Sequence, residues 1–131
     1  MSKKLHLIFN VVIIFFLNIS ILKAELKTPN NQIAPSDVIK IQLVGLMNND
    51  KGHLDSGIEQ TWNFAHPNNK QNTGPLPKFK MMIKGNSYKM LIDHLSHTIT
   101  QLGAGDDWAQ FEVIILDKDK IYHKFNWQVE K

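Results

Sequence analysis

The hydrophobic pattern of this chain changes period once, and that change constrains the fold more than any other feature of the sequence. Up to about residue 93, apolar residues recur three or four positions apart, as on one face of a helix. Residues 108–116 and 121–129 are instead rich in β-branched and aromatic side chains, and the second segment alternates strictly. Helices followed by antiparallel strands predict one α+β domain, with the helices packed on one face of the sheet.

The first of three expected helices spans residues 35–47. Pro35 suits its first turn, and Ser36 and Asp37 beside it are expected to act as cap and dipole partners. Its apolar residues have helical spacing, so the buried stripe is expected to consist of Ile39, Leu43, Leu46 and Met47.

The second helix is expected to begin at Ser56, which has the capping-box spacing to Glu59. The residues predicted to face the sheet from it are Ile58, Trp62 and Ala65. Residues 66–75 are polar, contain prolines and predict a loop. A third helix follows and ends near Gly85. Its stripe is Leu76, Phe79, Met82 and Ile83.

The second half of the chain predicts strands. A short helical turn is expected at residues 88–92, and a loosely alternating segment follows at 94–101. The strands at 108–116 and 121–129 are joined by Asp117–Lys120, whose alternating charges predict a solvated hairpin turn. The face of the last strand that is expected to be buried carries Ile121, His123, Phe125, Trp127 and Val129. The opposite face carries Tyr122, Lys124, Asn126 and Gln128.

The N-terminal segment has the layout of a secretory signal. Lys3 and Lys4 form a positive start, residues 5–21 are almost entirely apolar, and Ala24 is the small residue expected at a cleavage site. Residues 5–21 are also close to the shortest segment that crosses a bilayer, so an uncleaved membrane anchor is the alternative. We therefore expect an exported protein, periplasmic or secreted. Its parts are a signal peptide (1–24), a polar tether (25–34) and a single domain (35–131).

Composition excludes several classes of protein. The chain has no cysteine, which excludes disulfides, a thiol nucleophile and thiolate metal sites. Three of the 15 lysines lie in the leader, so the others match the 12 acidic residues and leave the domain without formal net charge. Arginine, the side chain that reads phosphates and bases bidentately, is also absent. We expect no nucleic-acid partner and no cofactor.

Several short motifs follow one another in a fixed order: Gly57-Ile58, Trp62 to Pro67, Asn69, Thr73-Gly74-Pro75-Leu76, Phe79, Met82, Tyr88 and Leu91. With them, residues 35–129 resemble an uncharacterised bacterial family (domain of unknown function 4864). Its members look similar to the cone-shaped α+β fold of nuclear transport factor 2. The resemblance implies helices that close over a curved antiparallel sheet, and it implies no reaction. The family usually runs on past the strand at 121–129, often into one more short strand. This sequence stops at Lys131, so either the sheet is one strand short or the sequence is truncated.

The histidines of the domain predict no metal site. His94 and His97 are three residues apart, a spacing that diverges on the strand expected there. Asp93 beside His94 suggests a general-base dyad, although adjacent side chains rarely face each other. His123 lies on the apolar face of the last strand, where an imidazole needs a hydrogen-bond partner or a cavity. We expect it to be a histidine at the edge of the core with one hydrogen bond.

The aromatic residues are candidates for the lining of a ligand site. Core packing is the simpler expectation for Trp62 and Trp127. Trp108 lies on the opposite face of its strand from Phe111 and is expected to pack at the sheet edge. The loop at 66–75 is long and polar enough for a rim or lid, or it simply joins two helices.

These features favour a domain that binds a small apolar ligand or another protein without catalysis. The residues expected to contact the ligand are Trp62, His94, His123, Phe125 and Trp127. The alternative is an isomerase, dehydratase or hydrolase-type enzyme with His123 or His94 as base inside the cone. A further alternative is a self-associating domain, a homodimer through the exposed sheet face that carries Trp108, Ile114 and Leu116.

The leader gives a first testable prediction. N-terminal sequencing of the protein recovered outside the cytoplasm should begin at Glu25, because cleavage is expected after Ala24. Membrane-bound protein that still begins at Met1 would show instead that residues 5–21 act as an anchor.

Overall fold

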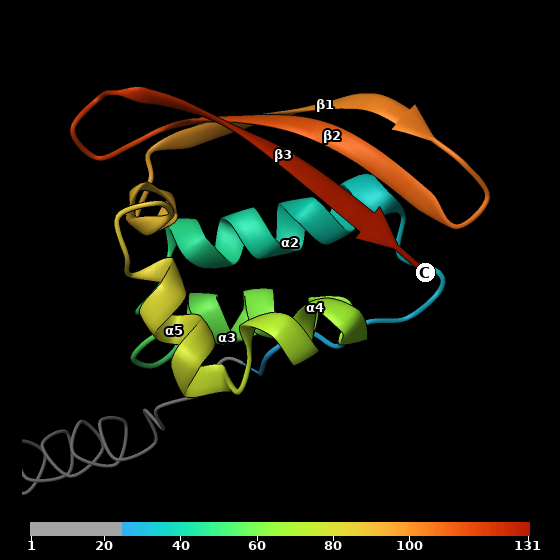
Figure 1. The fold of residues 1–131 in the computed structure, drawn as a ribbon. Helices are drawn as coiled ribbons and strands as arrows, with labels where there is room; N and C mark the ends of the chain where they lie inside the picture. The colour runs from blue at the N-terminus through green and yellow to red at the C-terminus, as the bar shows by residue number, and fades with distance from the viewer. Residues whose placement is uncertain (1–24) are drawn as a thin grey trace, which may run out of the picture.

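The structure is a computed structural model, and it describes residues 25–131. These residues form four α-helices, a 3₁₀ turn and one three-stranded antiparallel sheet (Figure 1). In chain order the elements are α2 (Pro35–Met47), α3 (Ser56–Asn63), α4 (Pro67–Thr73), α5 (Leu76–Ile83), η1 (Lys89–Leu91), β1 (Ser96–Ala104), β2 (Trp108–Leu116) and β3 (Tyr122–Glu130). The α+β class predicted from the change of period is confirmed.

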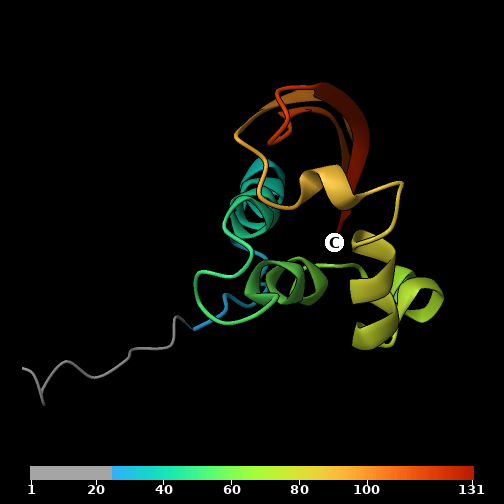
Figure 2. The ribbon, with the colours of Figure 1, turned by 90° about the vertical axis from the view of Figure 1, so that its left-hand side faces the viewer.

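The domain has three layers (Figures 1 and 2). The sheet is one outer layer, α2 lies beneath it, and α3, α4 and α5 lie on the far side of α2. Since α2 is covered from two sides, it buries Ile39, Leu43 and Leu46 completely and also the polar Gln42. The rest of the core consists of Ile58, Phe79, Ile83, Leu91, Ala109, Phe111, Val113 and Ile115.

The strands lie in the order β1-β2-β3, and both neighbouring pairs are antiparallel. β2 has the predicted bounds and β3 is displaced by one residue, whereas β1 begins two residues later than predicted and extends to Ala104. The register between β1 and β2 shifts between Gln101 and Gly103. Such an irregularity increases local bending, and the strands curve over α2 (Figure 2).

The two faces of the sheet are as predicted for β2 and β3. Along β3, half-buried residues alternate with exposed ones, and the half-buried face, which includes Phe125 and Trp127, packs against the core. The prediction is wrong for Ile121, which precedes the strand and is 56% exposed. Trp108 lies on the outer face of β2, opposite to the buried Phe111.

Helix α3 packs on α2 and α5, so the prediction that Ile58, Trp62 and Ala65 face the sheet is wrong. Of these three residues only Ile58 is buried, and Trp62 and Ala65 are half-buried. Periodicity also could not identify the element that covers α3, because α2 already occupies the sheet. The two helices approach closely at a pair of glycines. A Cβ atom on Gly57 would lie 2.0 Å from the backbone oxygen of Gly45.

The first two helices begin where predicted, but the predicted capping contacts of their side chains do not form. α2 has no side-chain cap, so Ser36 does not serve as one. Ser56 and Glu59 do not form a capping box, because each finds a partner outside α3: Ser56 Oγ donates to Asn49 O at 2.8 Å, and the Glu59 carboxylate binds Lys80. Tertiary contacts have replaced the local ones.

Residues 66–75, predicted to be a loop, contain helix α4. Pro67 takes the first helical position, where a missing N–H is no loss, and His66 Nδ1 accepts the N–H of Asn68 at 3.2 Å. No residue of α4 is buried. The helix therefore lacks the apolar stripe from which the other helices were predicted.

The predicted leader lies outside the described residues. Within residues 25–131, none of the helices is both long and apolar enough to cross a bilayer.

The contact between α2 and α3 gives a prediction about stability. Gly57→Ala should destabilise the domain by about 1–3 kcal/mol, because the helices must move apart to admit the new Cβ. Gly103→Ala is the control, since a Cβ there meets only the Trp108 ring, at 3.5 Å. Urea unfolding measures both free energies, and equal midpoints for the two variants would contradict a close helix contact.

Candidate functional site

A cleft of about 330 Å³ opens between β3 and the helical layers. Its walls come from α2, the end of α3, α4, α5 and the segment around η1, with β3 opposite. Figure 2 shows α4 and α5 displaced toward the β3 side of the domain, and residues of these helices and of the edge strand line the cleft together. The cleft brings together residues from both halves of the chain.

The floor of the cleft is apolar. The residues that line it on the helical side include Phe64, Phe79, Met82, Ile83 and Leu91. Phe125 and Trp127 line it from β3. Several of these side chains belong to the hydrophobic core or pack against it, so the shape of the floor is fixed by the folding of the domain.

Gln42 places a buried polar side chain at this floor. Its Nε2 donates to the backbone oxygen of Thr61 at 3.1 Å, and its Oε1 accepts from Trp127 Nε1 at 2.9 Å. The Thr61 hydroxyl donates to Gly57 O at 2.9 Å. Throughout residues 25–131, every buried side-chain nitrogen or oxygen has a hydrogen-bond partner. The floor therefore offers no free buried polar group, and a polar ligand atom placed on it would lose hydrogen bonds to water.

The rim of the cleft is polar. His66 Nε2 lies 3.8 Å from Glu130 Oε2, which joins the start of α4 to the end of β3. Because His66 Nδ1 accepts the N–H of Asn68, the neutral imidazole carries its hydrogen on Nε2. Tyr88 stacks on Phe125 with the ring centroids 6.4 Å apart. The rim thus presents an imidazole donor and a carboxylate acceptor beside an apolar floor.

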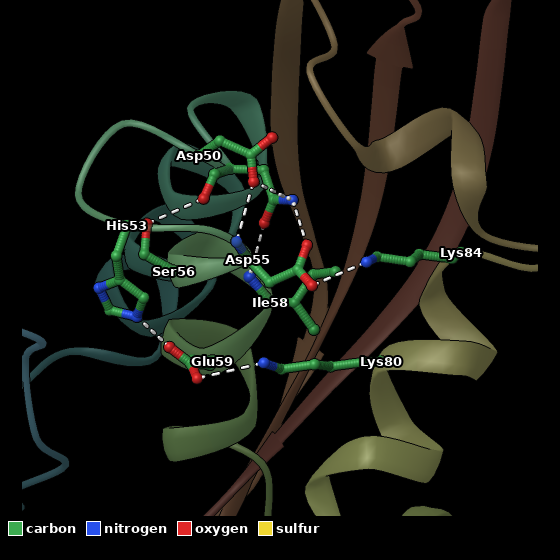
Figure 3. Close-up of polar contacts among 9 residues, drawn as sticks. Asp50, His53, Asp55, Ser56, Ile58, Glu59, Lys80 and Lys84 are labelled. Carbon is green, nitrogen blue, oxygen red and sulfur yellow. Dashed lines mark hydrogen bonds and ion pairs between the residues drawn. The ribbon is translucent and has the colours of Figure 1, made fainter.

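Charged contacts hold the α5 wall from behind (Figure 3). Lys80 Nζ lies 3.2 Å from Glu59 Oε1, and Lys84 Nζ lies 2.7 Å from Asp55 Oδ2. His53 contacts the other oxygen of Glu59. These contacts tie the polar face of α5 to α3 and to the residue before it, which leaves the apolar face of α5 for the cleft.

The loop before α3 is organised around Asn49, which is 2% exposed. Asn49 Oδ1 accepts the N–H of Ile58 at 3.0 Å, and its Nδ2 donates to Asp55 Oδ1 at 3.2 Å. Asp55 has a left-handed backbone with φ of 61°, and its N–H donates to Asp50 Oδ1 at 2.8 Å (Figure 3). The hydrogen bonds from two side chains hold Asp55 in this unfavourable conformation.

The carboxylates of Asp55 and Glu59 are held in their charged form. Burial acts to raise the pKa of Asp55, but hydrogen bonds from Lys84 and Asn49 and the nearby lysine charges lower it overall. The hydrogen bond from His53 is the main cause that lowers the pKa of Glu59. These groups use one another as partners, so we interpret the network as a brace for α5 rather than as a binding site.

The cleft brings together two of the five residues predicted to contact a ligand, Phe125 and Trp127. The other three, Trp62, His94 and His123, are not among its lining residues. Trp62 instead packs against Phe79, with ring centroids 5.1 Å apart, and Lys70 Nζ lies 5.4 Å from its ring centre. It supports the floor from behind.

The prediction that His94 and His97 diverge is wrong. His94 precedes β1 and can turn back, so its Nε2 lies 2.8 Å from His97 Nδ1. Its Nδ1 donates to Leu91 O at 2.6 Å, which also means that the ring does not pair with Asp93. Desolvation lowers the pKa of His94. Desolvation is also the main cause that lowers the pKa of His97, and the proximity of His94 and of the Lys40 charge adds to it. The pair is therefore held neutral.

His123 has the hydrogen bond expected of a histidine at the edge of the core. Its Nε2 lies 2.7 Å from Asp117 Oδ2. Asp117 also accepts hydrogen bonds from the N–H groups of Ile121 and Asp119, both at 2.9 Å. The bond from Ile121 is the largest cause that lowers the pKa of Asp117, and the bonds from His123 and Asp119 lower it further. Asp117 is only 7% exposed, so the prediction of a solvated turn is wrong at this residue.

The prediction that Trp108 packs at the sheet edge is wrong, because Trp108 is the first residue of β2, the central strand. A Cβ on Gly105 would lie 2.4 Å from Trp108 Nε1, so the indole covers the turn before β2 and still remains 45% exposed. With the half-buried Ile114 and Leu116 it lies on the outer face of the sheet, on the side away from the core.

Sequence reasoning missed Gln42, His66 and Glu130. Gln42 was detectable, because it lies three residues after Ile39 on the face predicted to be buried. The position of His66 before Pro67 is that of a helix cap and was a usable signal. No local pattern places Glu130 beside His66, since that contact arises only from the packing of β3 against α4.

No family model, curated protein or solved structure matches the chain significantly. The resemblance to the uncharacterised bacterial family and to the cone-shaped fold therefore stays a prediction. Among residues 25–131, no three side chains of a metal-ligating type come together as a candidate metal site.

The pair formed by the buried His94 and the half-buried His97 gives a prediction about pH. In the folded protein the pKa values of His94 and His97 are lowered from the ordinary value of 6.5, so the unfolded chain binds more protons as the medium becomes acidic. The stability that depends on these neutral histidines should be fully present above about pH 6.5 and be lost as pH falls toward their folded-state pKa values. Urea unfolding at pH 7.5, 6.5 and 5.5 should show that the free energy of unfolding falls less with acidity in His97→Gln than in the wild type. Identical pH profiles for the two proteins would contradict this assignment.

Proposed function

We propose that this chain is an exported, non-catalytic binding protein whose cleft takes a ligand with an apolar body and a polar end. The observation that carries the proposal is the division of the cleft into an aromatic floor without free buried polar groups and a rim with a donor and an acceptor. Mostly apolar pockets with a few oriented polar groups are the usual form of small-ligand sites.

The size of the cleft limits the apolar body of the ligand. A volume of about 330 Å³ lies near the lower end of the range of ligand pockets, roughly 300–1,000 Å³. Such a space takes two or three aromatic rings or a few branched aliphatic groups. Contact with Phe125 and Trp127 would remove their exposed apolar surface from water, at about 25 cal/mol per Å².

The rim limits the polar end. The His66 Nε2–H donates and the Glu130 carboxylate accepts, and the 3.8 Å between these groups leaves both with capacity for a ligand. A hydroxyl or an amide fits this pair, because each can accept from the imidazole and donate to the carboxylate. A ligand with a carboxylate end would instead face the charge of Glu130.

The position of the histidines supports binding over catalysis. His94 and His123, which the enzymatic alternative uses as bases, are outside the lining of the cleft and already paired. His66 lines it, but its accepting nitrogen is occupied by the N–H of Asn68. A general base needs a free accepting atom within reach of the proton that it removes.

Two features outside the cleft belong to the same proposal. The strands that curve over α2 (Figure 2) support the cone-shaped fold that the sequence resemblance implies. Lys3, Lys4 and the apolar residues after them support export. Self-association through Trp108 and its neighbours is compatible with binding, because that face of the sheet lies away from the cleft.

Filling the cleft tests the proposal. Ala65 lines the cleft, so Ala65→Phe should occupy part of its volume. The probe is N-phenyl-1-naphthylamine, a neutral dye with apolar rings and one N–H group. We expect saturable binding of one dye per wild-type chain and an affinity about ten-fold lower in Ala65→Phe, measured by dye fluorescence.

Ala104→Phe is the matched control, because it adds the same side chain at an exposed position at the end of β1. It should bind the dye as the wild type does. Dye binding that is absent in the wild type, or equal in all three proteins, would contradict the proposed function.

A further inference from the structure

The backbone of β3 is paired on one side only. Its neighbour is β2, and no described residue pairs with its other edge. Asp117 N donates to Ile121 O and Lys131 N donates to Asp107 O, so the odd-numbered residues bond to β2. Bonding alternates along an antiparallel pair. The residues whose N–H and C=O groups point to the free edge are therefore Tyr122, Lys124, Asn126, Gln128 and Glu130.

The cleft runs along this same edge. Its lining includes the inward-facing Phe125 and Trp127 of β3, and also the outward-facing Asn126, Gln128 and Glu130. Residues from both faces of one strand can line the same cavity only if the cavity extends past the edge of the strand. The unpaired backbone groups and the apolar floor are therefore adjacent.

We propose that the ligand of the cleft is an extended polypeptide segment that pairs with β3 as an added strand. The inference rests on the proposed binding function and names the chemical class of its ligand. A strand paired with β3 would lie about 4.8 Å from it, and every second side chain would point toward the helices. Those side chains would enter the cleft above Phe79, Met82 and Leu91, while the backbone bonds supply affinity that does not depend on sequence.

The helical layer favours a lone segment over a second copy of the domain. α4 and α5 extend past β3 on the side of the free edge (Figure 2), and they supply one wall of the cleft. A second copy joined edge to edge would bring its own helices beneath its β3, into the space that α4 and α5 occupy. A single extended segment needs only the space above the floor.

Charge on the outer face defines the partner further. Lys124 and Glu130 lie there at opposite ends of the free edge, and Lys124 Nζ is already 3.5 Å from Glu112 on the neighbouring strand. Opposite charges that face each other across paired strands stabilise the pair. The segment that fits in the antiparallel direction has a basic residue opposite Glu130, an acidic residue opposite Lys124, and apolar residues opposite Phe125, Trp127 and Val129.

The test uses the peptide Lys-Val-Thr-Val-Thr-Val-Glu, which has this pattern, labelled for fluorescence anisotropy. The matched peptide carries N-methyl groups on both threonines, the residues whose N–H groups would point to β3. We expect the first peptide to bind the wild-type protein and the N-methylated peptide to bind about ten-fold more weakly or not at all. Equal binding of the two peptides would overturn the inference.

A pair of variants tests the same contact from the protein side. Asn126→Pro removes an N–H that points to the free edge and leaves the bonds to β2 in place, whereas Asn126→Thr keeps that N–H. The peptide should lose about ten-fold in affinity for the proline variant and little for the threonine variant. Amide exchange at Lys124 and Gln128 in the wild type should slow when the peptide binds.

The dye separates the two proposals. Asn126 itself lines the cleft, so the dye comparison is made between its two variants. N-phenyl-1-naphthylamine makes no strand bonds, so it should bind Asn126→Pro and Asn126→Thr alike. Suppose that Ala65→Phe weakens dye binding but the peptide either does not bind or binds Asn126→Pro as well as it binds the wild type. That result would overturn the added strand and leave the binding function in place. If neither probe binds the wild type, both proposals fail.

Discussion

The packing of α2 between the sheet and α3 is the constraint on which the rest of the structure depends. Its apolar residues are buried from both sides, and Gln42 joins the layers through hydrogen bonds to Thr61 and to Trp127. Two glycines, Gly45 and Gly57, allow α3 to approach α2 closely. With α2 against the sheet, the remaining helices must pack farther out, and α4 and α5 come to lie across from the edge of β3 (Figures 1 and 2).

The cleft is a consequence of this arrangement. The cleft between β3 and α5 persists because most of its floor residues belong to the core or pack against it, and because α5 is braced from behind by Glu59 and Asp55. An exposed salt bridge contributes little by itself, but this network is partly buried and also satisfies the backbone of the loop before α3. The same cleft leaves one side of β3 without a strand partner among the described residues.

Sequence periodicity predicted the elements that bury a regular apolar face. It located α2, α5, β2 and β3, and it identified Phe125 and Trp127 because strict alternation fixes the direction of side chains on a strand. It missed α4, whose residues are all at least partly exposed, and so missed half of the rim of the cleft. Contacts between distant segments, such as His66 with Glu130, leave no periodic trace. The capping box at Ser56 failed for the same reason, since Asn49 offers a tertiary partner.

The indole N–H signals of the three tryptophans provide the most direct measurement of where a ligand binds. Trp127 lines the cleft and donates its indole N–H to Gln42, whereas Trp108 lies on the outer face of the sheet. In a titration of the ¹⁵N-labelled protein with N-phenyl-1-naphthylamine, followed by NMR, the account predicts a saturable shift of the Trp127 signal and a stationary Trp108 signal. A saturable shift of Trp108 with Trp127 unchanged would place the binding surface on the outer face of the sheet and contradict the account.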